Sequence, residues 1–263
     1  MPDDVDASGA RRDAAETTDD AFLGGALALL QPRSGYRAGI DAVLLAATVD
    51  ASSGAELLDL GAGVGTVGLS AARRLDALRV TLVESDPEAA ALARRNIARN
   101  GLDDRVRLVV GDVTGSGARL GELGLPFEAF DAAVANPPYH AEGRGTTAAL
   151  PGKAAANAMP ASALDLWVRA MARHVRPEGR ATLIHTAAAL PALLDAMAGR
   201  FGGLRVLPIH PRAGEPASRV IVRGIKSSRA PLALLSGLVL HGDGHAFTPE
   251  ADRILRHGAP LAV

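Results

Sequence analysis

The chain has 263 residues, a length that suits one large α/β domain or two small ones. Nearly half of the residues are apolar, which permits a substantial core, and cysteine is absent, which excludes disulfides, thiolate zinc sites and cysteine nucleophiles. The net charge is −1, but the first twenty residues carry seven acids and two arginines. The rest of the chain is therefore mildly basic and permits a nucleic-acid partner.

The N-terminal stretch is polar and acidic. Residues 1–20 have no periodic apolar pattern, which predicts a disordered tail, and no apolar stretch typical of a signal peptide. The apolar runs elsewhere are too short to span a bilayer. We expect a cytoplasmic protein without membrane association, in which residues 21–263 form one domain and residues 226–263 of that domain are a C-terminal appendix.

Strand and helix patterns alternate along this domain. The expected helices cover residues 42–49, 66–75, 86–102, 161–175 and 188–201. The expected strands cover residues 56–60, 79–85, 105–112, 130–136, 179–186, 204–211 and 218–226. The alternation predicts an α/β fold, with a seven-stranded, mostly parallel sheet, helices on both faces and a C-terminal antiparallel hairpin. Such a sheet binds its ligand at the carboxyl ends of the strands.

A glycine-rich loop, "LDLGAGVGTVGL", joins the first of these strands to a helix. Its glycines are Gly61, Gly63 and Gly65, and Asp59 precedes them. A dinucleotide fingerprint would need glycine at the sixth position, where Thr66 stands. The spacing instead resembles the first motif of S-adenosylmethionine-dependent methyltransferases. The resemblance implies that Asp59 and the glycines belong to the cofactor site; the alternative is a tight turn without a ligand.

Two acids end the next two strands. Glu84 closes "VTLVES", where a carboxylate can accept hydrogen bonds from both ribose hydroxyls of a nucleoside cofactor. Its spacing from Gly61 favours that role over a solvated acid. Asp112 closes "VVGD". The resemblance implies that it binds the adenine amino group, and the alternative is an Asx turn.

The fourth strand ends in "VANPPYH". The "NPPY" motif, Asn136 to Tyr139, resembles the signature of methyltransferases that modify exocyclic or amide nitrogens. Such a nitrogen is a poor nucleophile with two hydrogens, which the Asn136 side-chain oxygen and the Pro137 carbonyl can accept. Proline restrains both residues, and Tyr139 can stack on a planar acceptor. The resemblance also implies that Asn136 belongs to the cofactor site. Taken alone, it could be a strand-terminating turn.

The stretch before the first strand narrows the family. "GYRAGIDAVLLAA" resembles the N-terminal segment of the bacterial tRNA (adenine-N6)-methyltransferases that modify valine tRNA beside the anticodon. The resemblance implies that residues 21–50 cap the cofactor and that Tyr36 and Asp41 contribute to its site. Asp41 could also cap the helix that follows. The long connection 140–160 is expected to be either functional or disordered; if it is functional, Arg144 and Lys153 are expected to contact the substrate.

Other charged residues are less specific. The basic residues around the last hairpin contact phosphates or form a solvated surface; they are Arg212, Arg219, Arg223, Lys226 and Arg229. "HGDGH", residues 241–245, has too few ligands nearby in sequence for a metal site, so no metal is expected. His174 and His185 are expected to be structural.

The sequence therefore favours an S-adenosylmethionine-dependent methyltransferase acting on adenine N6 in tRNA or another structured RNA. A protein glutamine amide and a small amine are alternative acceptors. A binding protein that keeps the fold without catalysis is disfavoured by Asn136 and Tyr139, and a dehydrogenase by Thr66. The sequence does not indicate the oligomeric state.

Overall fold

The structure is a computed structural model that describes residues 17–35, 37–50, 54–115, 121–139 and 161–263, with the side chains of the last range described from residue 163. Its strands are β1 (Thr17–Phe22), β2 (Leu27–Pro32), β3 (Glu56–Leu60), β4 (Arg79–Glu84), β5 (Val106–Val110), β6 (Phe130–Ala135), β7 (Val175–Thr186), β8 (Phe201–Arg212), β9 (Arg219–Lys226), β10 (Ala233–Leu234) and β11 (Leu238–His241). Its helices are α2 (Ile40–Ala47), α3 (Thr66–Arg74), α4 (Pro87–Arg99), α6 (Ala161–His174), α7 (Leu190–Met197) and α8 (Pro249–His257), with 3₁₀ turns η1 (Leu23–Gly25) and η3 (Ala187–Ala189).

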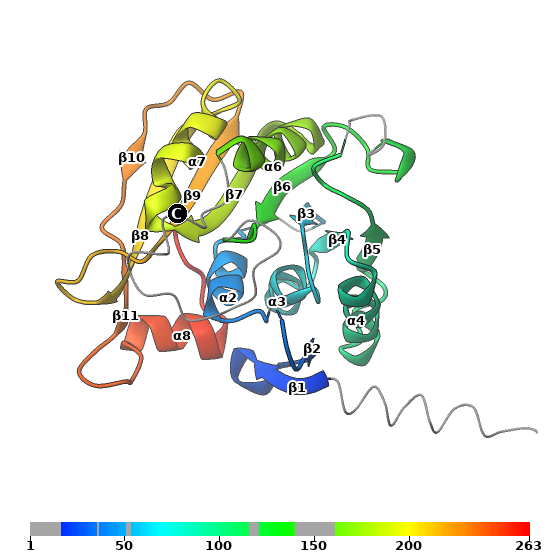
Figure 1. Cartoon of the computed structure of the whole chain (residues 1–263), viewed down its shortest axis with the longest axis horizontal. Coiled ribbons are helices and arrows are strands. Elements are labelled where there is room, and N and C mark those ends of the chain that lie inside the picture. Colours follow the sequence, from blue (N-terminus) through cyan, green and yellow to red (C-terminus); the bar gives the residue numbers. More distant parts are fainter. Residues whose placement is uncertain (1–16, 36, 51–53, 116–120, 140–160) are drawn as a thin grey trace, which may run out of the picture.

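A mixed sheet forms the centre of the molecule (Figure 1). Its strand order is β10-β8-β9-β7-β6-β3-β4-β5, and β11 also pairs with β8. The five neighbouring strands β7, β6, β3, β4 and β5 are mutually parallel. Strand β9 runs antiparallel to both β7 and β8. This confirms the predicted α/β class, the mostly parallel sheet and the closing hairpin.

The sheet has nine strands in the described part of the chain, two more than predicted. The seven expected strands are β3 to β9. The additional β10 and β11 come from the segment expected as a C-terminal appendix and pair with β8. They are two and four residues long, too short to give a recognisable alternation of apolar and polar residues.

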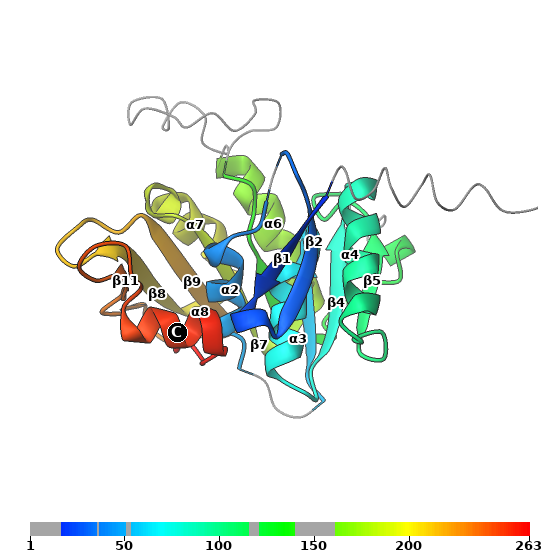
Figure 2. The same ribbon diagram turned by 90° about the horizontal axis from the view of Figure 1, so that it is seen from below.

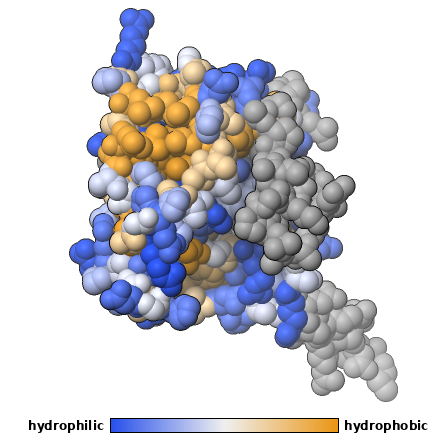
Figure 3. Space-filling model, turned by 60° about the vertical axis from the view of Figure 1, so that its left-hand side comes forward, coloured by the Kyte–Doolittle hydropathy of each residue, from blue (hydrophilic) through white to orange (hydrophobic). Residues whose placement is uncertain are grey.

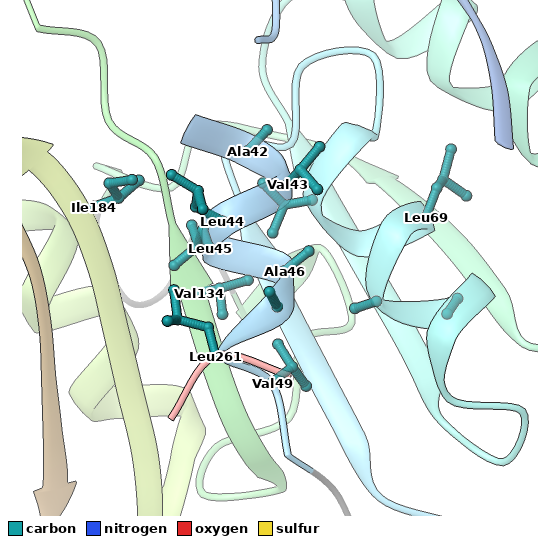
Figure 4. Close-up of a cluster of buried hydrophobic side chains, with 14 of the residues drawn as sticks. Ala42, Val43, Leu44, Leu45, Ala46, Val49, Leu69, Val134, Ile184 and Leu261 are labelled. Atoms are coloured by element: carbon teal, nitrogen blue, oxygen red, sulfur yellow. The ribbon is translucent and has the colours of Figure 1, made fainter. Parts of the chain in front are cut away.

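Helices cover both faces of the sheet (Figure 1). Consecutive strand residues enter opposite cores: Leu57 packs in the core with α2, α3 and α4, and Leu58 packs in the core with α6 and α7. Burial on both faces explains why the parallel strands are nearly continuous apolar runs. Figure 4 shows α2 in the first core, with Leu44 and Leu45 near Val134 of β6 and Ile184 of β7.

The prediction of a disordered tail up to residue 20 is wrong for residues 17–20. Residues 17–20 form the first part of β1, which pairs with β2. The acids there have partners on the body of the protein: Asp19 pairs with Arg99 at 2.7 Å, and Asp20 pairs with Arg37 at 2.7 Å. The acidic composition of the segment predicts disorder, but composition does not show that these charges have partners elsewhere in the chain.

The C-terminal segment is tied into the domain. Helix α8 packs against η1 and α2 (Figure 2). Beyond it, the Leu261 N–H donates to the Ala47 carbonyl at 2.9 Å. The Arg74 guanidinium donates to the carbonyls of Ala46 at 2.6 Å and Gly258 at 2.8 Å. These bonds satisfy carbonyl groups at the carboxyl ends of α2 and α8, where a cation is also favourable.

An apolar area lies on the surface that carries α7, β8 and β10 (Figure 3). Leu232 and Leu234, in and beside β10, are 51% and 70% exposed. Three strands separate β10 from β6, which leads into the "NPPY" motif. The apolar area is therefore remote in the sheet from that motif.

Candidate functional site

The glycine loop follows β3 and leads into α3. Gly61, Gly63 and Gly65 all have positive φ, at 63°, 57° and 92°, a conformation that favours glycine. A Cβ on Gly61 would come within 2.3 Å of the Trp167 ring of α6, whereas a Cβ on Gly63 would meet nothing within 4 Å. The loop is therefore packed from one side at Gly61 and leaves open space at Gly63.

Glu84 lies against this loop. It is the last residue of β4 and is 8% exposed. One carboxylate oxygen accepts the Gly63 N–H at 2.7 Å, and the other accepts the N–H groups of Ser85 and Asp86, each at 2.8 Å. Three backbone N–H groups thus hold the Glu84 carboxylate beside the glycine loop, at the end of its strand.

Asp59 lies beneath the loop. Its side chain is 1% exposed and accepts the Gly68 N–H of α3 at 2.9 Å. Burial raises its pKa to about 7; the Gly68 hydrogen bond opposes this rise and the charge of Glu84 adds to it. The geometry favours a structural role for Asp59, which fixes the start of α3 to β3.

Asp112 follows β5 and is exposed. One of its oxygens accepts the N–H of Thr114 at 2.8 Å and the Thr114 hydroxyl at 2.6 Å. This is an Asx-type turn, which the sequence permits at this position as an alternative to ligand binding.

The "NPPY" motif lies at the same edge of the sheet as the glycine loop. Leu60 of β3 is in register with Ala135 of β6, so Gly61 and Asn136 are the first residues beyond two neighbouring strands. The Asn136 side-chain oxygen is buried, and Pro137 is buried as well. The strand pairing therefore brings together two motifs that are 75 positions apart in the sequence.

Tyr139, at the end of the motif, is surrounded by side chains from three other elements. Its hydroxyl donates to an Asp41 carboxylate oxygen of α2 at 2.7 Å. The Arg219 guanidinium of β9 lies over its ring, 4.9 Å from the centroid, and donates to the same Asp41 oxygen at 2.9 Å. The His185 ring of β7 lies 4.8 Å away at an angle of 57°.

Electrostatics stabilise this cluster. Burial opposes the charge of Arg219, but the Asp41 carboxylate and a hydrogen bond with Tyr139 outweigh burial, so its pKa is raised above the ordinary arginine value. Asp41 was predicted at the cofactor, yet the contacts described here join it to Tyr139 and Arg219. No spacing signal in the sequence connects β7 or β9 to Tyr139, so Arg219 and His185 could not be assigned to the site from the sequence alone.

Most of the basic residues near the last hairpin have partners within the protein. Arg219 is paired with Asp41, and Lys226 with Glu128 at 2.8 Å. Arg223 is buried, donates to the Thr48 and Val263 carbonyls, and its pKa is lowered by burial. Arg212 donates to the Gly244 carbonyl at 2.7 Å. These contacts argue against a row of side chains available for phosphates.

Some predicted residues are not covered. Tyr36, Arg144 and Lys153 lie outside the described residues. Among the residues that are described, no group of three or more histidine, aspartate or glutamate side chains could hold a metal ion. The described helices include none that is long and apolar enough to cross a membrane.

Known proteins that are similar to this chain in sequence are named as methyltransferases. Residues 37–163 match the family described as "Methyltransferase small domain". The chain is 30% identical over 195 residues to the tRNA1(Val) (adenine(37)-N6)-methyltransferase of Phocaeicola vulgatus, covering 72% of this chain and 77% of that protein. It is 33% identical over 144 residues to the protein of that name from Shewanella amazonensis, covering 55% of this chain and 58% of the relative.

A solved structure is similar over nearly the whole fold. It is a predicted O-methyltransferase from Agrobacterium tumefaciens, with a TM-score of 0.72 and 33% identity, and the match covers 85% of this chain and 99% of that one. By contrast, the matches to the first curated relatives span only about half to three fifths of those proteins' length.

Proposed function

The chain belongs to the family of the tRNA1(Val) (adenine(37)-N6)-methyltransferases, and we propose that it transfers a methyl group from S-adenosylmethionine to the N6 amino group of an adenine in tRNA. The observation that carries the proposal is the register of β3 with β6. It brings the glycine loop next to the "NPPY" motif, which supports a reaction between a methyl donor held at the loop and an amine held at the motif.

The residues around the glycine loop fit the cofactor. The open space at Gly63 allows a ligand to approach the backbone, and the first turn of α3 lies directly behind. Glu84 is held beside Gly63, where its carboxylate can accept hydrogen bonds from ribose hydroxyls. Asp112, at the next strand end, uses one carboxylate oxygen in its Asx-type turn and offers the other to the adenine amino group. When bound, S-adenosylmethionine supplies a methyl group on a positively charged sulfur.

The acceptor amine is positioned by the "NPPY" motif. The Asn136 side-chain oxygen and the Pro137 carbonyl accept the two amino hydrogens and draw the nitrogen lone pair out of conjugation with the ring. Because proline restricts the backbone at and before its own position, both acceptors are fixed before the substrate binds. Tyr139 packs against the base, which is turned out of its stack to reach the site. We retain Arg144 and Lys153 as proposed RNA contacts. A tRNA substrate would place the protein in the cytoplasm.

The test is a transfer assay with radiolabelled S-adenosylmethionine and total RNA that lacks its native modification. We expect label in N6-methyladenosine, identified by mass after digestion to nucleosides. Asn136→Ala is expected to lower the transfer rate on the order of 100-fold, since it removes one of two preorganised acceptors. Its affinity for the cofactor, measured by calorimetry, should stay within about threefold of the wild type, because the glycine loop and Glu84 are unchanged.

Two outcomes would contradict the proposal. Cofactor binding without label in RNA would indicate another acceptor, a protein glutamine amide or a small amine. Full activity of Asn136→Ala would remove the motif from the mechanism.

A further inference from the structure

We infer that Asp41 and Arg219 are positioning residues for the acceptor: together they hold the Tyr139 ring in place, so Asp41 acts on the acceptor side of the site and not on the cofactor. The inference rests on the proposed function for the identity of the acceptor. It assigns roles to two charged side chains on elements far apart in the sequence, α2 and β9.

The hydrogen bonds restrict Tyr139 strongly. One carboxylate oxygen of Asp41 accepts both the Tyr139 hydroxyl at 2.7 Å and the Arg219 Nε–H at 2.9 Å. Neither the tyrosine nor the carboxylate can rotate without breaking one of these charge-assisted bonds. The Asp41 side chain is 19% exposed, so water replaces the lost partner poorly.

The rings add a second restraint. The Arg219 guanidinium lies over the Tyr139 ring, in the geometry of a cation–π contact. His185 is 1% exposed, and its Nδ1 accepts the Thr186 N–H at 2.9 Å, which fixes the imidazole beside the tyrosine. Tyr139 is therefore ordered by α2, β7 and β9 before any acceptor arrives, and preorganisation of this kind raises the rate of a positioned reaction.

The pair also balances charge where a polyanion must approach. Arg219 is 31% exposed at its side chain and neutralises Asp41. Without the guanidinium, the site would present an uncompensated carboxylate to the phosphates of RNA, and like charges at short range repel. Removal of the arginine alone should consequently harm transfer more than removal of both charges.

The experiment is a double-mutant cycle with Arg219→Gln, Asp41→Asn and the double variant. Asparagine at position 41 can still accept the tyrosine hydroxyl. We expect Arg219→Gln to lower kcat/KM for RNA by about tenfold or more, and the double variant to recover at least about threefold of that loss. Cofactor affinity of all three should remain within about twofold of the wild type.

Cofactor affinity has a readout that is independent of methyl transfer. Trp167 is the single tryptophan of the chain and packs on Gly61 of the glycine loop, so its fluorescence can follow a titration with S-adenosylhomocysteine. Glu84→Ala serves as the reference for a lost cofactor contact. Arg256→Gln is the matched control, since it removes a guanidinium from an exposed arginine–aspartate pair on α8, remote in the sequence from the site, and should leave transfer unchanged.

The outcomes separate cleanly. If Asp41→Asn or Arg219→Gln weakens cofactor binding as much as Glu84→Ala does, the pair belongs to the cofactor site and the inference is wrong. Unchanged transfer in both single variants would also overturn it. If the wild-type protein binds cofactor but methylates no RNA, the proposed function fails; the assignment of Asp41 away from the cofactor is then decided by the fluorescence titration alone.

Discussion

Asp59 is a buried carboxyl group held under the glycine loop, and its burial makes the stability of the folded state depend on pH. Burial raises its pKa to about 7 from the value of 3.8 that it has in the unfolded chain. Between about pH 4 and pH 7 the folded protein retains a proton that the unfolded chain has released. The contribution of Asp59 to stability therefore falls as the pH rises through this range, and its cost, on the order of 4 kcal/mol, is fully present above pH 7.

Asp59→Asn should remove this cost. The amide oxygen can still accept the Gly68 N–H, whereas the charge is gone. We expect the variant to unfold at higher urea concentration than the wild type at pH 8, with a smaller difference at pH 5. Asp103→Asn, which replaces an exposed acid, is the control and should leave the urea midpoint unchanged at both pH 8 and pH 5. A variant that is less stable than the wild type at pH 8 would show that the carboxylate has a stabilising partner.

At the scale of elements, the N-terminal hairpin is attached to α4 by two asparagines one helical turn apart. The Asn100 amide pairs with the N–H and carbonyl of Ala28, at 3.1 and 2.9 Å. The Asn96 amide pairs with the N–H and carbonyl of Leu30, at 2.8 and 3.0 Å, and also donates to the Val64 carbonyl of the glycine loop at 3.0 Å. Both amides thus take the place of a neighbouring strand for β2, and Asn96 alone reaches the loop.

The two asparagines form a matched pair for experiment. Asn96→Ala and Asn100→Ala should each lower the free energy of unfolding by about 1–3 kcal/mol, because each leaves backbone groups of β2 without a partner. Only Asn96→Ala should weaken cofactor binding, by about five- to tenfold, because only it releases the Val64 carbonyl. Fluorescence titration of Trp167 provides the measurement. Equal cofactor affinities in the two variants would show that the loop does not depend on Asn96.

Elements were predictable where the pattern was local. A few residues suffice to predict β3 and β4, which are apolar runs. The same holds for the start of α4, where the Asp86 side chain accepts the Glu88 N–H. β1 was missed because the partners that neutralise its acids lie elsewhere in the chain. β10 and β11 were missed because each is stabilised by pairing with β8, not by its own sequence.

The candidate site was predictable to a similar extent. Strand ends located the glycine loop, Glu84 and Asn136 correctly at one edge of the sheet. The surroundings of Tyr139 were not predictable. Its partner Asp41 lies 98 positions earlier in the sequence, and Arg219, which also bonds to Asp41, lies 178 positions after Asp41. Pairs at such separations leave no mark on a single sequence.

For the molecule as a whole, the C-terminal segment completes the core around α2. Leu261 and Val263 are each only 6% exposed. Deletion of residues 259–263 should lower the free energy of unfolding by about 3 kcal/mol or more, since it exposes two aliphatic side chains and the core beneath them. Urea unfolding measures the loss, with Ala262→Ser, at an exposed position, as the control. An unchanged midpoint would mean that the segment packs without stabilising the fold.

The contact between the C-terminal segment and the core around α2 has a consequence for folding during synthesis of the chain. Arg74 bonds to Gly258, which lies 184 residues later in the chain. At ribosomal rates the delay between the two is on the order of 10–40 s. Throughout that interval the nascent α2 core lacks the contacts that Gly258 and Leu261 supply, so the domain reaches its final packing only after this segment has been synthesised.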